Sequence, residues 1–121
     1  MPAKIVYVLN YFLPEQVAGT EVYVWALSKQ LIKRGWEVIV LIPNFGINDC
    51  DEYVFDDIRV IKYPEPSGEK RDIILGIEKP MGLKFFESIL KEEHPDILHF
   101  HEYSAGSGIG IEHFKIGRAH V

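Results

Sequence analysis

Two segments of the sequence carry residue types that could bind an anion or transfer a proton. One is a short turn at a predicted helix start, formed by Ala18, Gly19, Thr20 and Glu21. The other contains His99, His101 and Glu102, at the end of a predicted strand. Backbone N–H groups at a helix start favour anions, and a histidine exchanges a proton near neutral pH.

The turn allows two interpretations that the sequence does not separate. Gly19 could let a phosphate approach the backbone N–H groups, or it could only let the chain turn tightly against the preceding strand. Glu21 in the first helical turn stabilises the helix dipole by about 0.3 to 1 kcal/mol. The same carboxylate repels a bound anion unless its side chain is held aside.

The two histidines lie two residues apart on a strand and therefore share a face. A metal site needs a third converging ligand, and none has a recognisable spacing, so we predict no metal. We interpret His99 as a hydrogen-bonded core residue. His101 lies at the carboxyl end of the strand, where ligands bind in open α/β sheets, and is our candidate catalytic residue.

The turn belongs to a predicted strand–helix–strand unit over residues 4–40. An apolar run from Ile5 to Leu9 suits a strand buried on both faces. We predict a helix with Thr20 as its N-cap and an end at Gly35, which follows Lys33 and Arg34 in the last turn. A second strand over residues 37–42 then ends at Pro43.

The rest of the chain predicts two strands and one helix. We expect a loop over 45–57, a strand near the sheet edge over 58–63, and a long loop over 64–79. Pro80 can begin the next helix, which buries one stripe and ends before Pro95 with His94 as its cap. The stripe consists of Leu83, Phe86, Ile89 and Leu90. The fourth strand covers 96–101 and should be an open edge of the sheet.

Right-handed crossovers between these elements give an α/β fold, a Rossmann-like parallel sheet of order 3-2-1-4 with helices on both faces. In that order the carboxyl ends of the first and fourth strands are neighbours. The Gly19 turn and the His101 loop should therefore face the same crevice.

Composition limits the function classes. The chain has 121 residues, 47% of them hydrophobic, which predicts one domain, and its net charge of -5 argues against nucleic acid as a partner. One cysteine and no targeting or membrane segment fit the cytoplasm. The sequence lacks GxGxxG after the first strand and GxxxxGK[ST] throughout, so we expect neither a nicotinamide or flavin enzyme nor a P-loop NTPase, and no cofactor. The basic residues Lys33 and Arg34 could contact a membrane surface, but nothing else in the sequence supports this. We interpret them as the solvated end of the helix.

Four segments together resemble the N-terminal domain of family 4 (GT-B fold) retaining glycosyltransferases. They are the strand KIVYVLNYFLP, residues 18–21 where the family usually has Gly-Gly-x-Glu, the helix end LSKQLIKRGWEVIVL, and PDILHFHEY in place of Pro-Asp-x-x-His-x-His. The resemblance covers residues 4–110. Ala18 replaces the first glycine of the family turn, which adds a methyl group where the ligands come closest.

The resemblance implies half of a two-domain enzyme that moves a sugar from a nucleotide-sugar donor to a carbohydrate or lipid-linked acceptor with retention. By that match Ala18, Gly19, Thr20 and Glu21 would contact the donor phosphates or the acceptor. His101 would lie beside the transferred sugar. The second domain, with its pair of glutamates, would hold most of the donor, so we expect this chain to be inactive alone.

We expect the natural domain to span residues 1–114 and residues 115–121 to be non-native. Their sequence resembles the in-frame translation of a sequencing-library adapter, and an ordinary exposed C-terminus is the alternative. Two other functions stay open: a non-catalytic Rossmann-like module that binds a phosphorylated ligand or regulates a partner, and an epimerase of similar two-domain fold.

Overall fold

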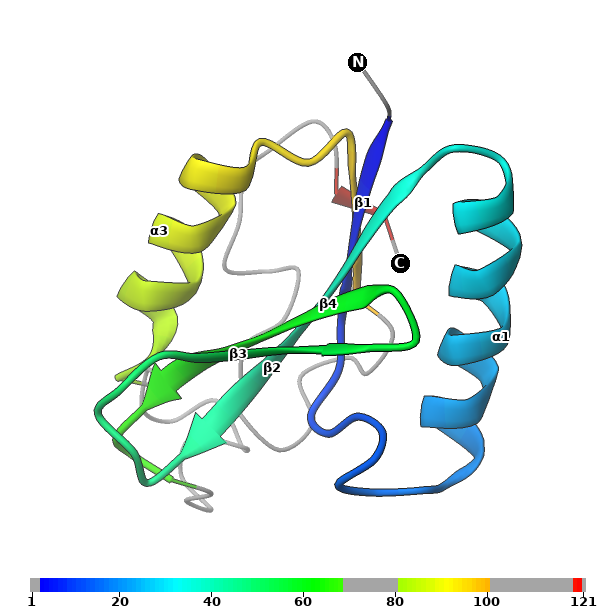
Figure 1. Cartoon of the computed structure of the whole chain (residues 1–121). Coiled ribbons are helices and arrows are strands. Elements are labelled where there is room, and N and C mark those ends of the chain that lie inside the picture. The colour runs from blue at the N-terminus through cyan, green and yellow to red at the C-terminus, as the bar shows by residue number, and fades with distance from the viewer. Residues whose placement is uncertain (1–2, 69–80, 101–118, 121) are drawn as a thin grey trace.

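The computed structural model describes residues 3–68 and 81–100, together with the backbone of residues 119–120. Six strands form one sheet of order β3-β4-β2-β1-β5-β6. Helix α1 lies on one side of the sheet and α3 on the other (Figure 1). The elements formed by the described residues are β1 (Lys4–Val8), α1 (Gly19–Lys33), β2 (Glu37–Phe45), β3 (Asp51–Phe55), β4 (Ile58–Glu65), α3 (Leu83–Glu93), β5 (Ile97–Phe100) and β6 (Ala119–His120).

The predicted fold class and the predicted order of the four main strands are confirmed. Strands β4, β2, β1 and β5 are the third, second, first and fourth strands of the prediction, and all their pairings are parallel. The sheet is wider than predicted. Strand β3 pairs antiparallel with β4, and β6 pairs parallel with β5. The expectation of an open edge at β5 was therefore wrong, and β4 is not the edge strand on the other side.

Alternate residues of the central strands supply two hydrophobic clusters, as expected for strands buried on both faces. The cluster beneath α1 takes Ile5 and Tyr7 from β1 together with Val24 from the helix. The cluster beneath α3 takes Val6 and Val8 from β1 and packs them with Phe86. The predicted stripe of α3 is confirmed, because its other members pack partly buried against this second cluster.

The predicted loop over residues 45–57 was wrong, because much of it forms a β-hairpin. Strand β3 pairs with β4 in a register that places Phe55 opposite Ile58. The two residues between them, Asp56 and Asp57, have φ angles of 50° and 68°. Positive φ at both positions is the backbone of a tight hairpin turn that matches the twist of the strands.

Strand β2 was predicted to end at Ile42 but continues to Phe45. Pro43 lies within it and pairs with Tyr63 of β4. The paired residues of β1 reach only Leu41 of β2. Beyond that point β2 has a partner on one side only, so a proline without a backbone donor is tolerated.

The ends of the helices match the prediction at three positions and differ at two, the starts of the helices. Helix α3 begins at Leu83 with Gly82 as its N-cap, and not at Pro80. Gly35 follows α1 with a φ of 88°, and His94 is the C-cap of α3 with a φ of 49°. Lys33 lies in the last turn of α1, as expected. Thr20 is not the N-cap of α1; Ala18 takes that position and makes no side-chain capping hydrogen bond.

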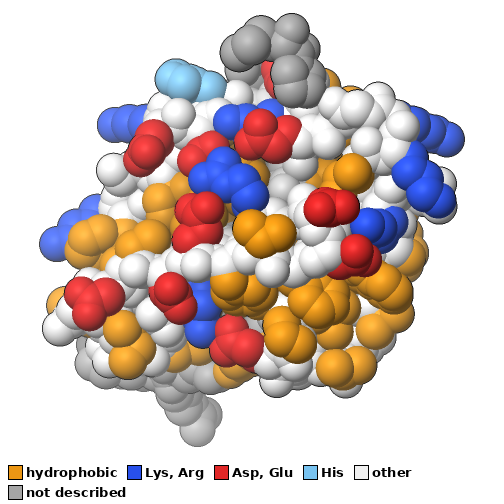
Figure 2. Space-filling model, viewed as in Figure 1, with side chains coloured by type: hydrophobic (Ala, Val, Ile, Leu, Met, Phe, Trp, Pro, Cys, Tyr) orange, Lys and Arg blue, Asp and Glu red, His pale blue; other side chains and the backbone are white. Residues whose placement is uncertain are grey.

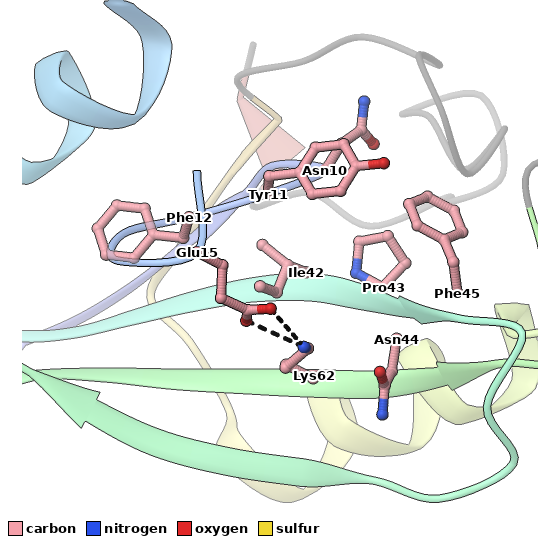
Figure 3. A pocket seen from close by; sticks show the side chains of 9 residues that line it. All are labelled: Asn10, Tyr11, Phe12, Glu15, Ile42, Pro43, Asn44, Phe45 and Lys62. Atoms are coloured by element: carbon pink, nitrogen blue, oxygen red, sulfur yellow. Dashed lines mark hydrogen bonds and ion pairs between the residues drawn. The ribbon is translucent and has the colours of Figure 1, made fainter. Parts of the chain in front are cut away.

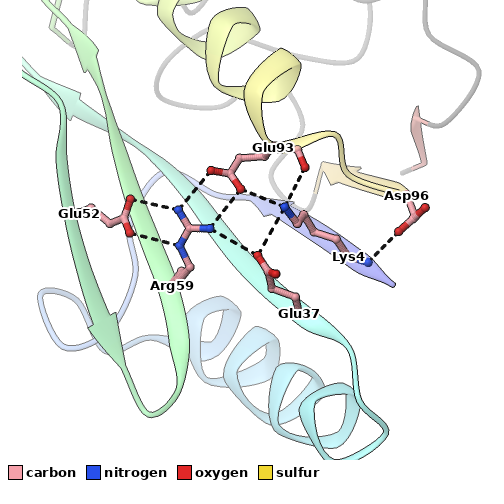
Figure 4. Close-up of polar contacts among 6 residues, drawn as sticks. All are labelled: Lys4, Glu37, Glu52, Arg59, Glu93 and Asp96. Atoms are coloured by element: carbon pink, nitrogen blue, oxygen red, sulfur yellow. Dashed lines mark hydrogen bonds and ion pairs between the residues drawn. The ribbon is translucent and has the colours of Figure 1, made fainter. Parts of the chain in front are cut away.

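A charged cluster joins the elements at the amino ends of the parallel strands (Figure 4). Nζ of Lys4 in β1 and Nη1 of Arg59 in β4 each lie 3.1 Å from the carboxylate oxygen Oε1 of Glu93 at the end of α3. Arg59 also pairs with Glu52 of the β3 edge strand over 3.2 Å, and both cations contact Glu37. The cluster fixes the end of the sheet opposite the candidate site.

Apolar side chains are exposed around the start of α1. Val17, Val22 and Tyr23 are among the exposed large hydrophobic residues, and apolar side chains gather over this part of the molecule in Figure 2. Within residues 3–68 and 81–100, no helix combines the length and hydrophobicity that a membrane span needs.

Candidate functional site

The carboxyl ends of β1 and β5 lie side by side, as the predicted strand order requires. Val8 at the end of β1 is the register partner of Phe100 at the end of β5. From Val8 the chain continues through a connecting loop, residues 9–18, to the start of α1. This is the place where open α/β sheets bind ligands. His101 lies outside the described residues, so its position relative to Gly19 stays a prediction.

The first turn of α1 has no side-chain cap. Ala18 is in extended conformation, with φ -142° and ψ 177°, and its carbonyl oxygen accepts the first helical hydrogen bond from the N–H of Val22 over 3.1 Å. The N–H groups that precede Val22 in the helix have no partner within it. With the helix dipole they form a positively polarised end on a helix of 15 residues.

Gly19 is not required by the fold. A Cβ atom built at this position meets nothing within 4 Å, and its φ is not in the left-handed region. The interpretation that Gly19 only permits a tight turn is therefore not supported. The exposed surface at Gly19 instead leaves room for a ligand to reach the backbone.

Glu21 is held aside from solvent. Its side chain is 1% exposed, and its Oε1 accepts a hydrogen bond of 2.8 Å from Nε2 of Gln16 in the connecting loop. The Gln16 backbone N–H in turn donates to the carbonyl oxygen of Phe12 over 3.1 Å. Glu21 thus ties the helix start to the loop, and its carboxylate does not project into the space in front of Gly19.

His99 is only partly buried, so its assignment as a core residue needs correction. Its ring packs beside that of Tyr7 on β1, with centroids 5.4 Å apart. Burial raises the pKa of Tyr7, with a smaller contribution from Tyr23, so Tyr7 stays neutral beside the imidazole. Among the described residues, no three His, Cys, Asp or Glu side chains are grouped so that they could hold a metal ion.

The hairpin that the sequence did not reveal holds the connecting loop in place. Tyr53 of β3 donates a hydrogen bond of 2.8 Å from its hydroxyl to the carbonyl oxygen of Leu13. Burial, with the charges of Glu15 and Asp51, raises the pKa of Tyr53 to about 12, so this hydroxyl keeps its proton. Lys62 of β4 pairs with Glu15 of the same loop over 2.9 Å.

A pocket opens between the connecting loop and the carboxyl halves of β2 and β4 (Figure 3). Its volume is about 230 Å³. The lining residues are Asn10, Tyr11, Phe12, Glu15, Ile42, Pro43, Asn44, Phe45 and Lys62. Sequence reasoning missed this pocket. The position of Asn10 and Tyr11 directly after β1 was the available signal, because ligands bind at that end of a strand.

The chain matches the family model described as Glycosyltransferase Family 4 over residues 17–120. The match begins in the connecting loop and includes the first turn of α1 and all of β2, β4 and β5. No curated protein matches the chain.

Proposed function

Because the chain belongs to Glycosyltransferase Family 4, we propose that it forms the acceptor-side domain of an enzyme that transfers a sugar from a nucleotide-sugar donor with retention. The acceptor is a carbohydrate or a lipid-linked molecule. A second domain, which the resemblance implies, holds most of the donor. This chain alone is then inactive, and we place the enzyme in the cytoplasm.

The observation that carries the proposal is the uncapped start of α1, which the connecting loop joins to the end of β1, next to the end of β5. Sugar transfer from a nucleotide donor releases a diphosphate while positive charge develops on the sugar. Groups that stabilise the leaving diphosphate lower the barrier most. The N–H groups of the first helical turn offer that stabilisation, and the open space at Gly19 lets the phosphate oxygens reach them.

The four residues of the turn have separate roles in this proposal. Ala18 and Gly19 border the phosphate, Thr20 supplies a backbone N–H and a hydroxyl, and Glu21 positions the helix start through Gln16. His101 follows β5 directly in sequence, and we propose that it binds a hydroxyl of the transferred sugar. No metal ion is needed in this half of the enzyme.

The test is a transfer assay on the protein made from the whole natural reading frame and on this chain alone. Each is offered a panel of nucleotide sugars with simple glycosides as acceptors, and the anomeric configuration of any product is read by NMR. We expect transfer with retention by the whole protein and none by the chain alone. Transfer by neither, or transfer with inversion, would contradict the proposal.

The limits of the domain are a separate proposal. We assign residues 1–114 to the domain and residues 115–121 to a non-native tail. The family match and strand β6 both reach residue 120, but neither identifies the origin of these residues. Sequencing the natural locus decides: a frame that departs from this sequence after residue 114 supports the assignment, and a frame that encodes Gly117 to Val121 refutes it.

A further inference from the structure

The pocket beside the connecting loop has room for one small ring. Pockets that enclose drug-sized ligands have volumes of about 300 to 1,000 Å³. The present pocket, at about 230 Å³, is smaller than that range. It is therefore too small for a nucleotide and suited to a single sugar ring. It lies on the loop that leads to Gly19, so a ring bound there is close in sequence to the proposed phosphate site.

The polar side of the pocket is an ion pair without net charge. Nζ of Lys62 lies 2.9 and 3.0 Å from the two carboxylate oxygens of Glu15. The Lys62 side chain is 16% exposed and that of Glu15 is 48% exposed. An anionic ligand would have to compete with Glu15 for Lys62 and would meet the Glu15 carboxylate. A neutral hydroxyl does not compete with the ion pair in this way. The Glu15 carboxylate has further lone pairs that can accept a hydrogen bond from a hydroxyl, and the Lys62 ammonium group has three N–H groups that can donate one.

The other side of the pocket is apolar. The rings of Tyr11 and Phe45 lie 5.9 Å apart at 51°, above the end of β2 (Figure 3). Pro43 and Ile42 continue this surface. A pyranose has apolar C–H faces and a rim of hydroxyl groups. Aromatic rings on one side and an ion pair on the other match that distribution of polarity.

From this pairing of surfaces we infer that the pocket is the acceptor subsite and that it binds one neutral pyranose ring. The assignment as acceptor subsite rests on the proposed glycosyltransferase function. Phe45 and Tyr11 contact a face of the ring. Glu15 accepts a hydrogen bond from one hydroxyl, and Lys62 donates one to a neighbouring oxygen.

The binding test uses this chain and needs neither donor nor transfer. Backbone amide NMR shifts are followed while the methyl α-pyranosides of glucose, galactose and mannose, and separately inorganic phosphate, are added. We expect saturable shifts at Tyr11, Phe45 and Lys62 with at least one pyranoside and none there with phosphate. Phe45→Leu should weaken binding about fivefold, as expected for one lost aromatic contact. Lys62→Met should also weaken it.

The matched control is Val54→Ala, because Val54 is 66% exposed on the edge strand and does not line the pocket. It should leave pyranoside binding unchanged. Absence of saturable shifts with all three pyranosides, or shifts at these residues with phosphate alone, would overturn the inference. So would equal binding by the wild type, Phe45→Leu and Lys62→Met.

A second measurement separates this inference from the proposed function. In the whole enzyme, Phe45→Leu should raise KM for the acceptor and leave KM for the donor unchanged. Transfer with an unchanged acceptor KM would refute the acceptor subsite and leave the proposed function standing. Pyranoside binding by a protein that transfers no sugar would refute the proposed function, and with it the acceptor role, and leave a sugar-binding pocket.

Discussion

The hydroxyl of Tyr53 and the carbonyl oxygen of Leu13 are joined by a hydrogen bond of 2.8 Å across 40 residues of sequence. The bond attaches the edge strand β3 to the connecting loop, which lines the pocket and leads to Gly19. Together with the Lys62 to Glu15 ion pair, it makes the position of the site depend on the β3–β4 hairpin. In the proposed function, this loop has to keep its position while donor and acceptor meet in front of it.

Tyr53→Phe should remove this attachment and keep the packing of the ring. We expect a loss of about 0.5 to 1.5 kcal/mol in the free energy of unfolding, measured by denaturant titration. The backbone amide of Gln16, which donates to Phe12 within the loop, should exchange with deuterium faster. Val54→Ala is the control and should change neither. Exchange at Gln16 that is the same in both variants would show that the loop does not depend on Tyr53.

Asp57→Gly should stabilise the hairpin by up to about 1 kcal/mol, because glycine takes up a positive φ without steric cost. Asp57 has a φ of 68°. Asp56→Gly is the matched comparison. In the wild type, the Asp56 carboxylate accepts hydrogen bonds from Trp25 and Lys29 of α1. Replacing Asp56 with glycine removes these bonds, so it should not increase the stability. Thermal unfolding of both variants measures the difference, and a larger gain at position 56 would mean that the docking to α1 is unimportant.

Glu65→Gln should change how stability depends on pH. Glu65 is fully buried; burial raises its pKa, and hydrogen bonds from Ser67, Gly82 and Met81 oppose the rise. Its contribution to stability is therefore fully present below the pKa of the unfolded chain and is lost as pH rises through the folded pKa. Relative to wild type, the variant should gain stability from acid to neutral pH. Parallel stability curves for the variant and the wild type would refute the assignment.

Glu93→Gln should have the opposite pH dependence. Burial would raise the pKa of Glu93, but hydrogen bonds from Arg59 and Lys4 outweigh it and lower the pKa. The stabilisation is present above the unfolded pKa and is lost as pH falls through the folded one. The variant should lose about 1.5 to 3 kcal/mol at neutral pH, typical of hydrogen bonds to a charged group, and converge with wild type in acid. Chemical unfolding at several pH values measures this, and a constant difference would be inconsistent with it.

The strand–helix–strand unit and the main strand order could be predicted because their signals are local. Apolar runs at Ile5 to Leu9 and Glu37 to Ile42, with Gly35 between them, specify a buried parallel pair. The hairpin had no such signal. Its turn is Asp56 and Asp57 instead of a pair with glycine, and its edge strand begins with two charged residues.

Part of the candidate site could likewise be predicted from the sequence, and part could not. The turn at Gly19 is visible in the sequence because it sits between a strand and a helix. The pocket is not, because it depends on the contact of Lys62 with Glu15, 47 residues apart, and on a strand that continues through Pro43. The Glu21 side chain could not be placed from sequence either, since its position depends on Gln16 in an irregular loop.

The central claim is that the start of α1 exists to bind a ligand, and Gly19→Val in the whole enzyme tests it most directly. The control is Ala26→Val, the addition of a branched side chain at an exposed position of the same helix. We predict that Gly19→Val lowers kcat/KM for transfer by about tenfold or more, because the side chain keeps the phosphate from the N–H groups. Its Tm should stay within about 3 °C of wild type, as for the control. An unchanged kcat/KM, or a loss of activity that only follows a fall in Tm, would contradict the claim.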